Sequence, residues 1–593
     1  MLLYSLLHLT GYDLTLDDLK SFRQLGSRTP GHPERGVAPG IEVATGPLGQ
    51  GLANAVGMAL TERMLAARFS RPDHDVVDHR TWFICSDGDL MEGISHEAAS
   101  LAGFLGLHKL IGVYDDNHIS LDGPTSLSFG EDIPGRFAAY GWRVMHVADG
   151  NDPAAVERAL EEASSSDGRP TLIACRTNIG FGSPNKHDSS SSHGNPLGAE
   201  EVILTKRAYG WPESPDFIVP DDVAAWAGEL VRRGRDHETA WEARMAAYRT
   251  AFPTEAAELD RRLSGELPNG WAEDLPSYGA DAKPIATRSA SKEALNAIAA
   301  RVPELVGGAA DLASSTNTVI TDGGDVSPGS FGGRNIHFGV REHAMAAIVN
   351  GMNAHGGVRV YGSTFLTFSD YMKNPIRMAS LMHLPSIFVF THDSVALGED
   401  GPTHQPIEHL AGLRAIPGIA VIRPADANET SQAWRVAIER GERPTVLIFT
   451  RQALPTILGP VHVDRGAYVV DPGDDCILIA SGSEVAVART ARTLLAADGV
   501  SARVVSMPSA EIFLAQTADY REEVLPAARR ARVTVEAAAS LGWHRWAGDL
   551  GEVIAIDRFG ESAPGEIVLA ELGITAEAVA KAAKRSIERC ATA

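Results

Sequence analysis

Short apolar runs alternate along the chain with longer stretches that have the apolar spacing of amphipathic helices. TWFICSDGD contains a predicted strand, Thr81–Cys85, which ends in a polar turn with Gly88. ISHEAASLAGFLG then has helical spacing, and KLIGVYDDN contains a second predicted strand, Leu110–Tyr114. A strand, a helix and a strand in this order predict a parallel βαβ unit, and ligands bind at the carboxyl ends of strands in such sheets.

The same alternation continues to the C-terminus and predicts an α/β protein with three consecutive domains and mainly parallel sheets. Further strands are expected at 358–362, 386–390 and 419–424, and a third region opens with CILIASGSEV. The expected divisions are a first domain, a linker rich in Pro, Gly and acidic residues, a second domain and a C-terminal domain: 1–250, 251–284, 285–455 and 468–593.

Composition narrows the classes of function. The 593 residues carry a net charge of −23, which disfavours nonspecific binding to nucleic acid and to anionic membranes. An acidic protein that binds an anionic substrate must therefore gather its cations locally. The four cysteines are far apart in sequence, which indicates reduced thiols and a cytoplasmic protein. MLLYSLLHLTGYDL has no basic residue before Lys20, so it predicts a helix within a fold and not a signal peptide.

Two polar segments follow the first two predicted strands. SDGDLMEG contains Asp87 and YDDNHIS contains Asn117, thirty positions later, a spacing that one βαβ crossover can bring together. A carboxylate and an amide oxygen suit Mg²⁺ or Ca²⁺, with phosphate oxygens completing the shell, and Gly88 would let backbone N–H groups approach a phosphate. The alternative is a pair of ordinary turns, because Asp, Gly and Asn favour turns. The glycines of TGPLGQGLANAVGMAL match neither the P-loop nor the G-x-G-x-x-G pattern of nucleotide-binding proteins.

A second polar segment, HDSVALGEDGPTHQP at 392–406, follows the apolar run PSIFVF. It places His392, His404 and three carboxylates within thirteen positions. This is either a solvated loop or a site that binds a small polar molecule. Zinc binding by the two histidines is also conceivable, but no third soft ligand is nearby in sequence.

Several long motifs give the chain a resemblance to a known family. G-D-G followed about thirty residues later by Asn is the thiamine diphosphate motif, with Ser86 standing here where its first glycine is usual. With TPGHPE (29–34), TGPLGQG (45–51), HFGVREHAM (337–345), THDSVALGEDGPTHQP (391–406) and TRQ (450–452), the whole chain resembles the transketolases, in that family's order.

The resemblance implies an activity and an assembly. Transketolases transfer a two-carbon ketol group from a ketose phosphate, such as xylulose 5-phosphate, to an aldose phosphate, such as ribose 5-phosphate or erythrose 4-phosphate. Thiamine diphosphate supplies the carbanion chemistry. The three domains would be a diphosphate domain, a pyrimidine domain and the C-terminal domain. The family further implies a homodimer with active sites at the subunit interface, and a place in the pentose phosphate pathway or the Calvin cycle.

The resemblance also assigns cofactor residues. A divalent metal, Mg²⁺ or else Ca²⁺ or Mn²⁺, would be held by Asp87, Asn117 and the carbonyl of Ile119. Glu342 would hydrogen-bond the aminopyrimidine ring of the cofactor, and shielding from water would raise its pKa. Taken alone, Glu342 could be a surface carboxylate, and aromatics three apart could be plain core. The other cofactor contacts would be Gly46, Leu48, Gly88, Asp311, Phe365, Phe368 and Tyr371.

The same reasoning assigns the substrate residues. His392 would face the phosphate of the sugar, His404 would lie along the substrate, and Asp400 would bond a sugar hydroxyl. Arginine suits phosphate because its planar fork donates two hydrogen bonds. The remaining contacts would be His32, near the cofactor and the donor hydroxyls, and Arg288, Ser315 and Arg451 around the phosphate. Glu92 and Glu97 match glutamates that link the cofactor sites of two subunits.

Two departures from the family pattern stand out. Ser190 occupies the position of a family histidine beside the thiazolium ring, with His187 and His193 on either side. The role of that histidine is therefore either absent here or served by His187 after a shift of the loop. Family members also carry several tens of residues before the segment that begins this chain, with a G-H-P-G motif, two active-site histidines and a strand. The expectation is that the chain is N-terminally incomplete. The alternative to an active enzyme is therefore a catalytically impaired remnant that binds thiamine diphosphate. Related enzymes that act on pyruvate-like donors would not need Arg288, Ser315, His392 and Arg451 together.

Overall fold

The computed structural model describes residues 1–165, 167–279, 281–457 and 459–593. They form two compact units. The first unit contains residues 1–264, 326–333 and 347–357, and the second contains residues 265–325, 334–346 and 358–593.

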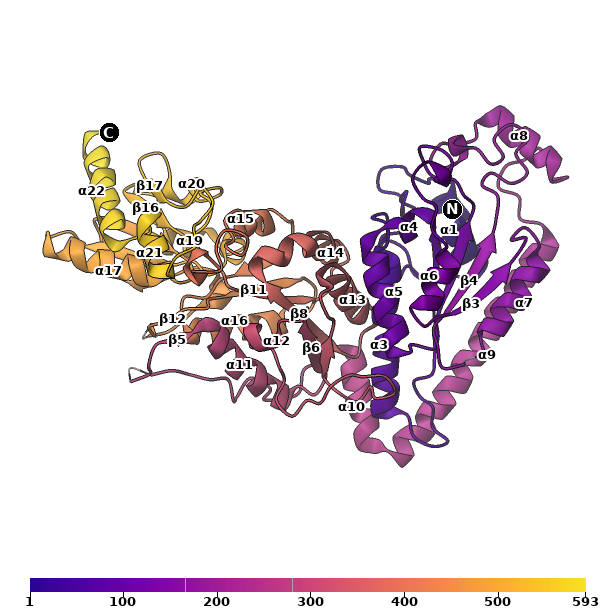
Figure 1. Ribbon diagram of the computed structural model, residues 1–593, viewed down its shortest axis with the longest axis horizontal. Coiled ribbons are helices and arrows are strands. Elements are labelled where there is room, and N and C mark those ends of the chain that lie inside the picture. The colour runs from indigo at the N-terminus through magenta and orange to yellow at the C-terminus, as the bar shows by residue number, and fades with distance from the viewer. Residues whose placement is uncertain (166, 280, 458) are drawn as a thin grey trace. The chain divides into compact units, whose positions relative to one another are not determined.

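A parallel sheet forms the centre of the first unit (Figure 1). Its strand order is β1-β2-β4-β3, with bounds Thr81–Ser86, Leu110–Asp116, Thr171–Arg176 and Arg143–Val147. Parallel pairing of β1 with β2 sets Cys85 opposite Tyr114 and Ser86 opposite Asp115. The polar segments that follow these two strands therefore begin side by side, as the βαβ reading predicts. β1 lies at one edge of the sheet and exposes Trp82 and Ile84.

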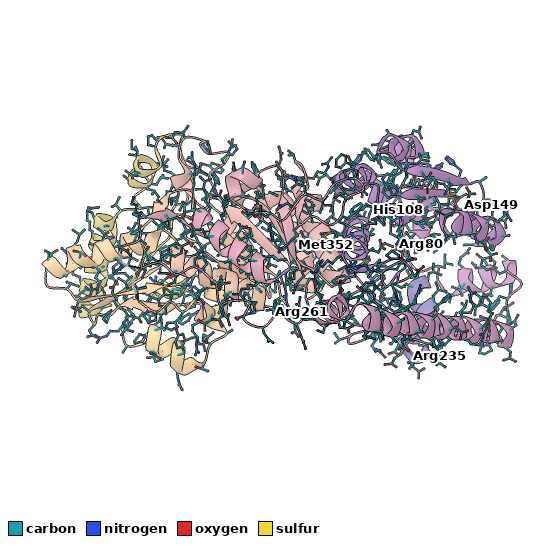
Figure 2. The ribbon with its side chains drawn as sticks, turned by 90° about the horizontal axis from the view of Figure 1, so that it is seen from below. Arg80, His108, Asp149, Arg235, Arg261 and Met352 are labelled. Atoms are coloured by element: carbon teal, nitrogen blue, oxygen red, sulfur yellow. The ribbon has the colours of Figure 1, made fainter. Side chains whose placement is uncertain are left out.

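Helices cover this sheet, and most of their boundaries follow from the sequence. The alanine-rich helix α3 is buried on most of its surface, because it packs on α5 and β1. The long helix α9 is exposed along most of its length, and Arg235 lies on it (Figure 2). The helices of this unit are α1 Leu2–Leu9, α2 Leu16–Lys20, α3 Gln50–Phe69, α4 Asp87–Met91, α5 Gly93–Leu105, α6 Ile133–Ala139, α7 Pro153–Ala163, α8 Ala199–Ala208, α9 Asp221–Ala251 and α10 Pro253–Ser264.

The second unit contains two large sheets. The first is wholly parallel, with order β10-β11-β9-β8-β6-β7, and the second has the order β13-β15-β14-β16-β17 with only β13 antiparallel. Strands such as β9 and β11 are buried at every position, as expected for strands covered on both faces. The bounds are β6 Leu305–Ala309, β7 Asn335–His337, β8 Arg359–Phe365, β9 Ile387–Thr391, β10 Ala420–Ile422, β11 Thr445–Phe449, β13 Tyr468–Asp471, β14 Cys476–Ala480, β15 Ala502–Ser506, β16 Arg532–Val535 and β17 Glu552–Ile554.

Each of these sheets has its own helices and core. Trp434 of α16 lies in the core between α11, α16 and the six-stranded sheet, and α17 and α22 pack together over β14 and β16. A short antiparallel pair, β5 Ile285–Ala286 and β12 Ala453–Leu454, precedes and follows the first sheet. The helices are α11 Thr287–Arg301, α12 Ala313–Thr316, α14 Ser369–Leu381, α15 His409–Arg414, α16 Ala427–Glu439, α17 Glu484–Ala497, α18 Ala510–Leu514, α19 Ala518–Val524, α20 His544–Ala547, α21 Gly565–Glu571 and α22 Ala576–Thr592. Helix α13, Glu342–His355, contributes residues to both units.

Two expectations need correction. The segment after β1 is not a simple turn: Asp87 begins the short helix α4, because the Asp89 carboxylate accepts a hydrogen bond from the Ser86 N–H and caps it. The expected linker 251–284 is partly helical, because α10 within it buries Ala256 and Leu259 on one face. Position 280 of that segment lies outside the described residues.

The prediction of reduced thiols is confirmed. Cys85, Cys175, Cys476 and Cys590 are all free, and the first three are buried. Across the part of the chain that the structure describes, every helix is either too short or too polar to cross a bilayer.

Candidate active site

The carboxylate of Asp87 stands at the end of β1 with one oxygen bonded and one oxygen unpartnered. Tyr114 donates a hydrogen bond of 2.7 Å to Asp87 Oδ1, while Asp87 Oδ2 is buried and has no hydrogen-bond partner among the described residues. Burial, opposed by the Tyr114 hydrogen bond, raises the pKa of Asp87. A buried carboxylate with a free oxygen is stabilised by a bound cation. The site therefore fits a divalent metal.

The turn after β2 supplies the other expected metal ligands. Asn117 is buried, and its amide N–H₂ donates to Asp115 Oδ2 at 3.2 Å. Its Oδ1 accepts from the N–H of Ile119 at 2.9 Å, and His118 between them has a left-handed backbone with φ of 59°. Oxygen ligands of this kind suit Mg²⁺ or Ca²⁺. A cavity of about 560 Å³ opens beside Asp87 and is lined by Tyr114, Asp116, His118 and the segment 124–126 and 129–134.

Three sequence motifs of the first unit meet near this cation site. A Cβ at Gly88 would lie 3.0 Å from Leu48 Cδ1, so Leu48 rests on the start of α4. The N–H of Gly49 donates to Asp89 Oδ1 at 2.9 Å, which joins TGPLGQG to SDGDLMEG. A Cβ at Gly46 would lie 3.4 Å from His32 Cγ, which brings TPGHPE to the same place. Leu48 is 47% exposed, an apolar side chain available to pack on a bound group.

The loop that departs from the family pattern is also in this unit. Ser190 begins a single 3₁₀ turn, Ser190–Ser192, and its carbonyl accepts from the N–H of His193 at 3.0 Å. His187 packs on the ring of Phe181 with centroids 6.0 Å apart and lies 3.3 Å from the Asp188 carboxylate. Whether His187 replaces the family histidine stays a prediction. Glu92 and Glu97 lie on the segment that starts α5.

In the second unit, the carboxyl ends of four parallel strands bring expected substrate and cofactor residues to one edge. His392 follows β9, Arg451 follows β11, Asp311 follows β6 and Phe365 ends β8. Arg288 at the start of α11 joins them, because its N–H bonds the carbonyl of Thr450 at 3.4 Å. These residues therefore lie at the edge of the sheet where ligands bind in α/β proteins.

Aromatic rings line this edge. The rings of Phe365 and Phe368 stack with centroids 6.0 Å apart, and Tyr371 continues the stack at 6.2 Å from Phe368. The imidazole of His392 lies 3.8 Å from Phe365, and that of His404 lies 5.5 Å from Phe368. Tyr371 is 62% exposed, so the stack reaches the surface and is not plain core.

Cations gather around His392. Arg451 bonds the carbonyl of Leu397, and Arg288 bonds the carbonyl of Ser315 at 2.8 Å. Burial and the charge of Arg451 both lower the pKa of Arg288, whose buried Nε has no partner among the residues that the structure describes. Burial, followed by the charges of Arg288, Arg451 and His404, lowers the pKa of His392 to about 3. Two neighbouring guanidiniums with an unpartnered donor form a binding site for an anion.

The remaining expected residues fall into three settings. Glu342 begins α13 and is buried, and burial raises its pKa, so it is not a surface carboxylate. Asp400 is exposed in the loop between His392 and His404. Asp311 is exposed, with a left-handed backbone and φ of 60°.

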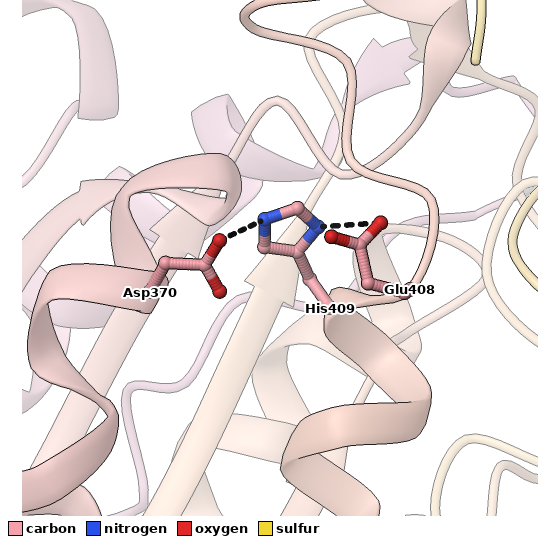
Figure 3. Close-up of side chains that lie close together, drawn as sticks. All are labelled: Asp370, Glu408 and His409. Atoms are coloured by element: carbon pink, nitrogen blue, oxygen red, sulfur yellow. Dashed lines mark ion pairs between the residues drawn. The ribbon is translucent and has the colours of Figure 1, made fainter.

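Sequence reasoning did not single out His409, which anchors the end of the 392–409 segment. Its imidazole is buried between two exposed carboxylates, with Nε2 3.2 Å from Asp370 and Nδ1 3.9 Å from Glu408 (Figure 3). One ligand atom from each of the three side chains lies within 4.8 Å of the other two, although the closest carboxylate contacts are to different ring nitrogens. His409 links this segment to α14, the helix that carries Tyr371.

Comparison with known proteins agrees with this geometry. Residues 1–268 match the family described as "Transketolase, thiamine diphosphate binding domain". Residues 283–456 match "Transketolase, pyrimidine binding domain", and residues 466–575 match "Transketolase-like TK C-terminal domain". The chain belongs to the transketolase family.

Curated relatives and solved structures with the transketolase name extend this result. A transketolase of Geobacillus stearothermophilus is 54% identical over 98% of the chain and 89% of that relative, and one of Bacillus subtilis is 49% identical over 99% and 90%. A transketolase structure from Leishmania mexicana is 46% identical, with a TM-score of 0.96 over 99% of this chain and 88% of that chain. A Pichia stipitis transketolase in complex with sedoheptulose-7-phosphate is 42% identical, with a TM-score of 0.97 over the same shares. The predicted family and α/β fold class are confirmed.

Proposed function

We propose that the chain is a transketolase that transfers a two-carbon ketol group from a ketose phosphate to an aldose phosphate. Xylulose 5-phosphate is the expected donor, and ribose 5-phosphate or erythrose 4-phosphate the acceptor. The observation that carries this proposal is the pair Arg288 and Arg451 beside His392, in which the buried Nε of Arg288 has no hydrogen-bond partner within the described parts of the chain. The Pichia stipitis relative, solved with sedoheptulose-7-phosphate, supports a sugar phosphate as the anion.

The residues assigned to the cofactor have distinct tasks in this proposal. Asp87, Asn117 and the carbonyl of Ile119 hold Mg²⁺, which binds the diphosphate of the cofactor. Thiamine diphosphate contacts Gly46, Leu48 and Gly88. This cofactor supplies the carbanion chemistry for transfer of the two-carbon group. Glu342, with its raised pKa, holds or shares a proton at the aminopyrimidine ring. Phe365, Phe368, Tyr371 and Asp311 complete the cofactor contacts.

The substrate contacts follow from charge and position. Arg288, Arg451, Ser315 and His392 bind the phosphate, and Asp400 and His404 bind hydroxyls along the sugar. A neutral His392 donates one hydrogen bond without adding a third charge to the arginine pair. His32 lies near the cofactor and the donor hydroxyls. We propose that 1–250 serve as the diphosphate domain, 285–455 as the pyrimidine domain and 468–593 as the C-terminal domain.

We further propose a homodimer in the cytoplasm, with Glu92 and Glu97 linking the cofactor sites of two subunits. The pathway would be the pentose phosphate pathway or the Calvin cycle. These proposals rest on membership in the family, and sedimentation of the purified chain tests the dimer.

The test of function is an assay of the purified chain with thiamine diphosphate, Mg²⁺, xylulose 5-phosphate and ribose 5-phosphate. Formation of sedoheptulose 7-phosphate is the expected result. Pyruvate as donor is the control, because an enzyme for pyruvate-like donors would use it. If the chain binds thiamine diphosphate but forms no sedoheptulose 7-phosphate, the impaired remnant is the correct description.

A further inference from the structure

A fully buried arginine lies behind the substrate loop, defined here as residues 392–407. Arg423 follows β10 and is 0% exposed. Its Nε and Nη2 donate to Asp393 Oδ2 at 2.9 and 2.7 Å. Its Nη1 donates to Glu484 and, at 3.1 Å, to the carbonyl of Ser481. The guanidinium thus joins the substrate loop to the C-terminal region.

The network continues on the C-terminal side. Glu536 lies 3.7 Å from Arg423 Nη1 and accepts two hydrogen bonds from Arg414, at 2.7 and 2.9 Å. Trp543 Nε1 donates to the same carboxylate at 2.6 Å. Burial alone would raise the pKa of Glu536, but Arg414 and Arg423 lower it to about 2. The carboxylate is therefore ionised, and the network is a set of true ion pairs.

Burying charged groups costs desolvation free energy, so this network is better explained by the geometry that it enforces than by the stability that it adds. Two arginines and three carboxylates are withdrawn from water here, and such a set contributes little net stability compared with apolar packing. Removal of one member leaves an unpaired buried charge, so the geometry is strongly enforced. A network of this kind fixes one arrangement of the segments that it joins.

The segment that it fixes contains a strained substrate residue. His392 has φ of 60°, a left-handed conformation that is uncommon for a residue with a side chain. Asp393, the next residue, is 1% exposed and bonds Arg423 through the same carboxylate oxygen twice. The two hydrogen bonds from Arg423 to Asp393 fix the backbone at 392–393, and this backbone conformation places the His392 ring against Phe365.

The C-terminal region also holds the rest of the substrate loop. Gln405 Nε2 donates to the carbonyls of Glu561 at 2.9 Å and Gly398 at 3.0 Å. The hydroxyl of Ser562 donates to the carbonyl of Glu399. A Cβ at Gly565 would lie 2.2 Å from the carbonyl oxygen of Ala396, so the two backbones touch. The loop is therefore held at its start by Arg423 and along its length by residues beyond position 480.

We propose that Arg423 is a positioning residue, which, held by Glu484 and Glu536 of the C-terminal region, fixes Asp393 and so keeps His392 facing the phosphate of the donor sugar. This inference rests on the proposed function, because it uses the phosphate role of His392. It gives the C-terminal region a part in donor recognition without any contact of its own with the sugar.

The first experiment compares Arg423→Lys with the parent chain. Lysine keeps the charge but cannot make the forked bonds to Asp393 and Glu484. The KM for xylulose 5-phosphate should rise about tenfold, the value of one charge-assisted hydrogen bond, while the KM for hydroxypyruvate, which has no phosphate, changes less than about twofold. Arg489→Lys is the matched control, because Arg489 bonds Asp471 at 2.8 Å in the same region and touches no residue of the loop among its described contacts.

A structural defect would look different. It would lower kcat for both donors by the same factor and leave the ratio of the two KM values unchanged, and that outcome overturns the proposal. Asp393→Asn keeps the shape of the side chain and removes its charge. This variant should also raise the ratio of the KM for xylulose 5-phosphate to the KM for hydroxypyruvate. The change should vanish in a His392→Ala background, since Arg423 acts through His392. An equal rise of the ratio in that background also overturns the proposal.

A measurement without turnover separates this inference from the proposed function. Inorganic phosphate should perturb the ring ¹⁵N signals of His392 in the parent chain. In Arg423→Lys, the same perturbation should need about ten times more phosphate. If the parent binds phosphate in this way but makes no sedoheptulose 7-phosphate, the function fails and the positioning role stands. If the parent is active and Arg423→Lys responds to phosphate like the parent, the positioning role fails alone.

Discussion

The Tyr114 hydroxyl donates a hydrogen bond to one oxygen of Asp87, and the other oxygen of that buried carboxylate has no partner in the described ranges of the chain. The hydroxyl fixes the orientation of the carboxylate, and the free oxygen faces the place where a cation is proposed. The Tyr114 side chain would thus select which oxygen is available to the proposed metal.

Asp87→Asn should abolish Mg²⁺-dependent binding of thiamine diphosphate, because an amide cannot supply the anionic ligand beside a cation-bound diphosphate. Titration calorimetry with and without Mg²⁺ measures the effect, and affinity should fall at least a hundredfold, about 3 kcal/mol. Asp122→Asn, an exposed change in the next loop, is the control and should bind like the parent. Unchanged affinity in Asp87→Asn would remove the metal assignment.

Glu342→Gln should bind thiamine diphosphate but slow the exchange of its C2 proton with solvent by at least about a hundredfold. The amide has the size of the carboxyl but cannot share a proton with the aminopyrimidine ring. Quenched-flow hydrogen exchange followed by NMR gives the rate. Exchange at the parental rate would show that the buried Glu342 has a structural role only.

Arg451→Ala should weaken phosphorylated donors far more than unphosphorylated ones. One or two charge-assisted hydrogen bonds are lost, which raises the KM for xylulose 5-phosphate about tenfold or more. Initial rates with xylulose 5-phosphate and with hydroxypyruvate measure this, and Arg435→Ala, at an exposed ion pair with Glu439, is the control. Equal effects of Arg451→Ala on both donors would contradict the phosphate pocket.

The raised pKa of Glu429 predicts that the free energy of unfolding falls as pH rises. Burial and the neighbouring Asp426 raise its pKa from 4.5 to about 7. A raised carboxyl pKa means that its contribution to stability is complete below pH 4.5 and is lost as pH rises through 7. The loss is about 3 kcal/mol.

Urea unfolding at pH 5 and pH 8 tests this contribution. The midpoint of the parent chain should fall between the two values, and Glu429→Gln should remove much of that fall. Glu439→Gln, an exposed glutamate, should behave like the parent. If Glu429→Gln shows the full parental fall, ionisation of Glu429 is not the cause.

Much of the fold could be predicted because strands buried on both faces are continuous apolar runs. The strands expected at 81–85, 110–114 and 386–390 are present within one or two residues. Helix α10 was missed because PTEAAELDRRLS is mostly polar, and its few buried apolar side chains resemble those of a linker. The five residues of α4 are too few for any helical period, so only the Ser86 and Asp89 pair marked its start.

The site was predictable where chemistry and position along the chain coincide. His392 directly follows a buried strand that the apolar run PSIFVF predicts, so it could be assigned to a sheet edge from the sequence. Arg423 could not be assigned in this way. Its partners Asp393 and Glu484 lie 30 and 61 positions away, in different parts of the chain, and nothing local marks them as a set.

The backbone contact between Gly565 and Ala396 bears on how members of this family can be recombined. A C-terminal region taken from a relative must present glycine at this point and an acceptor for Gln405 at Glu561, or the incoming segment would collide with the substrate loop. The crossover point of a working chimera is therefore set by matching two separate stretches, 392–407 and 560–565. A junction placed only between the proposed domains 285–455 and 468–593 would take the substrate loop from one parent and the residues that hold it from the other.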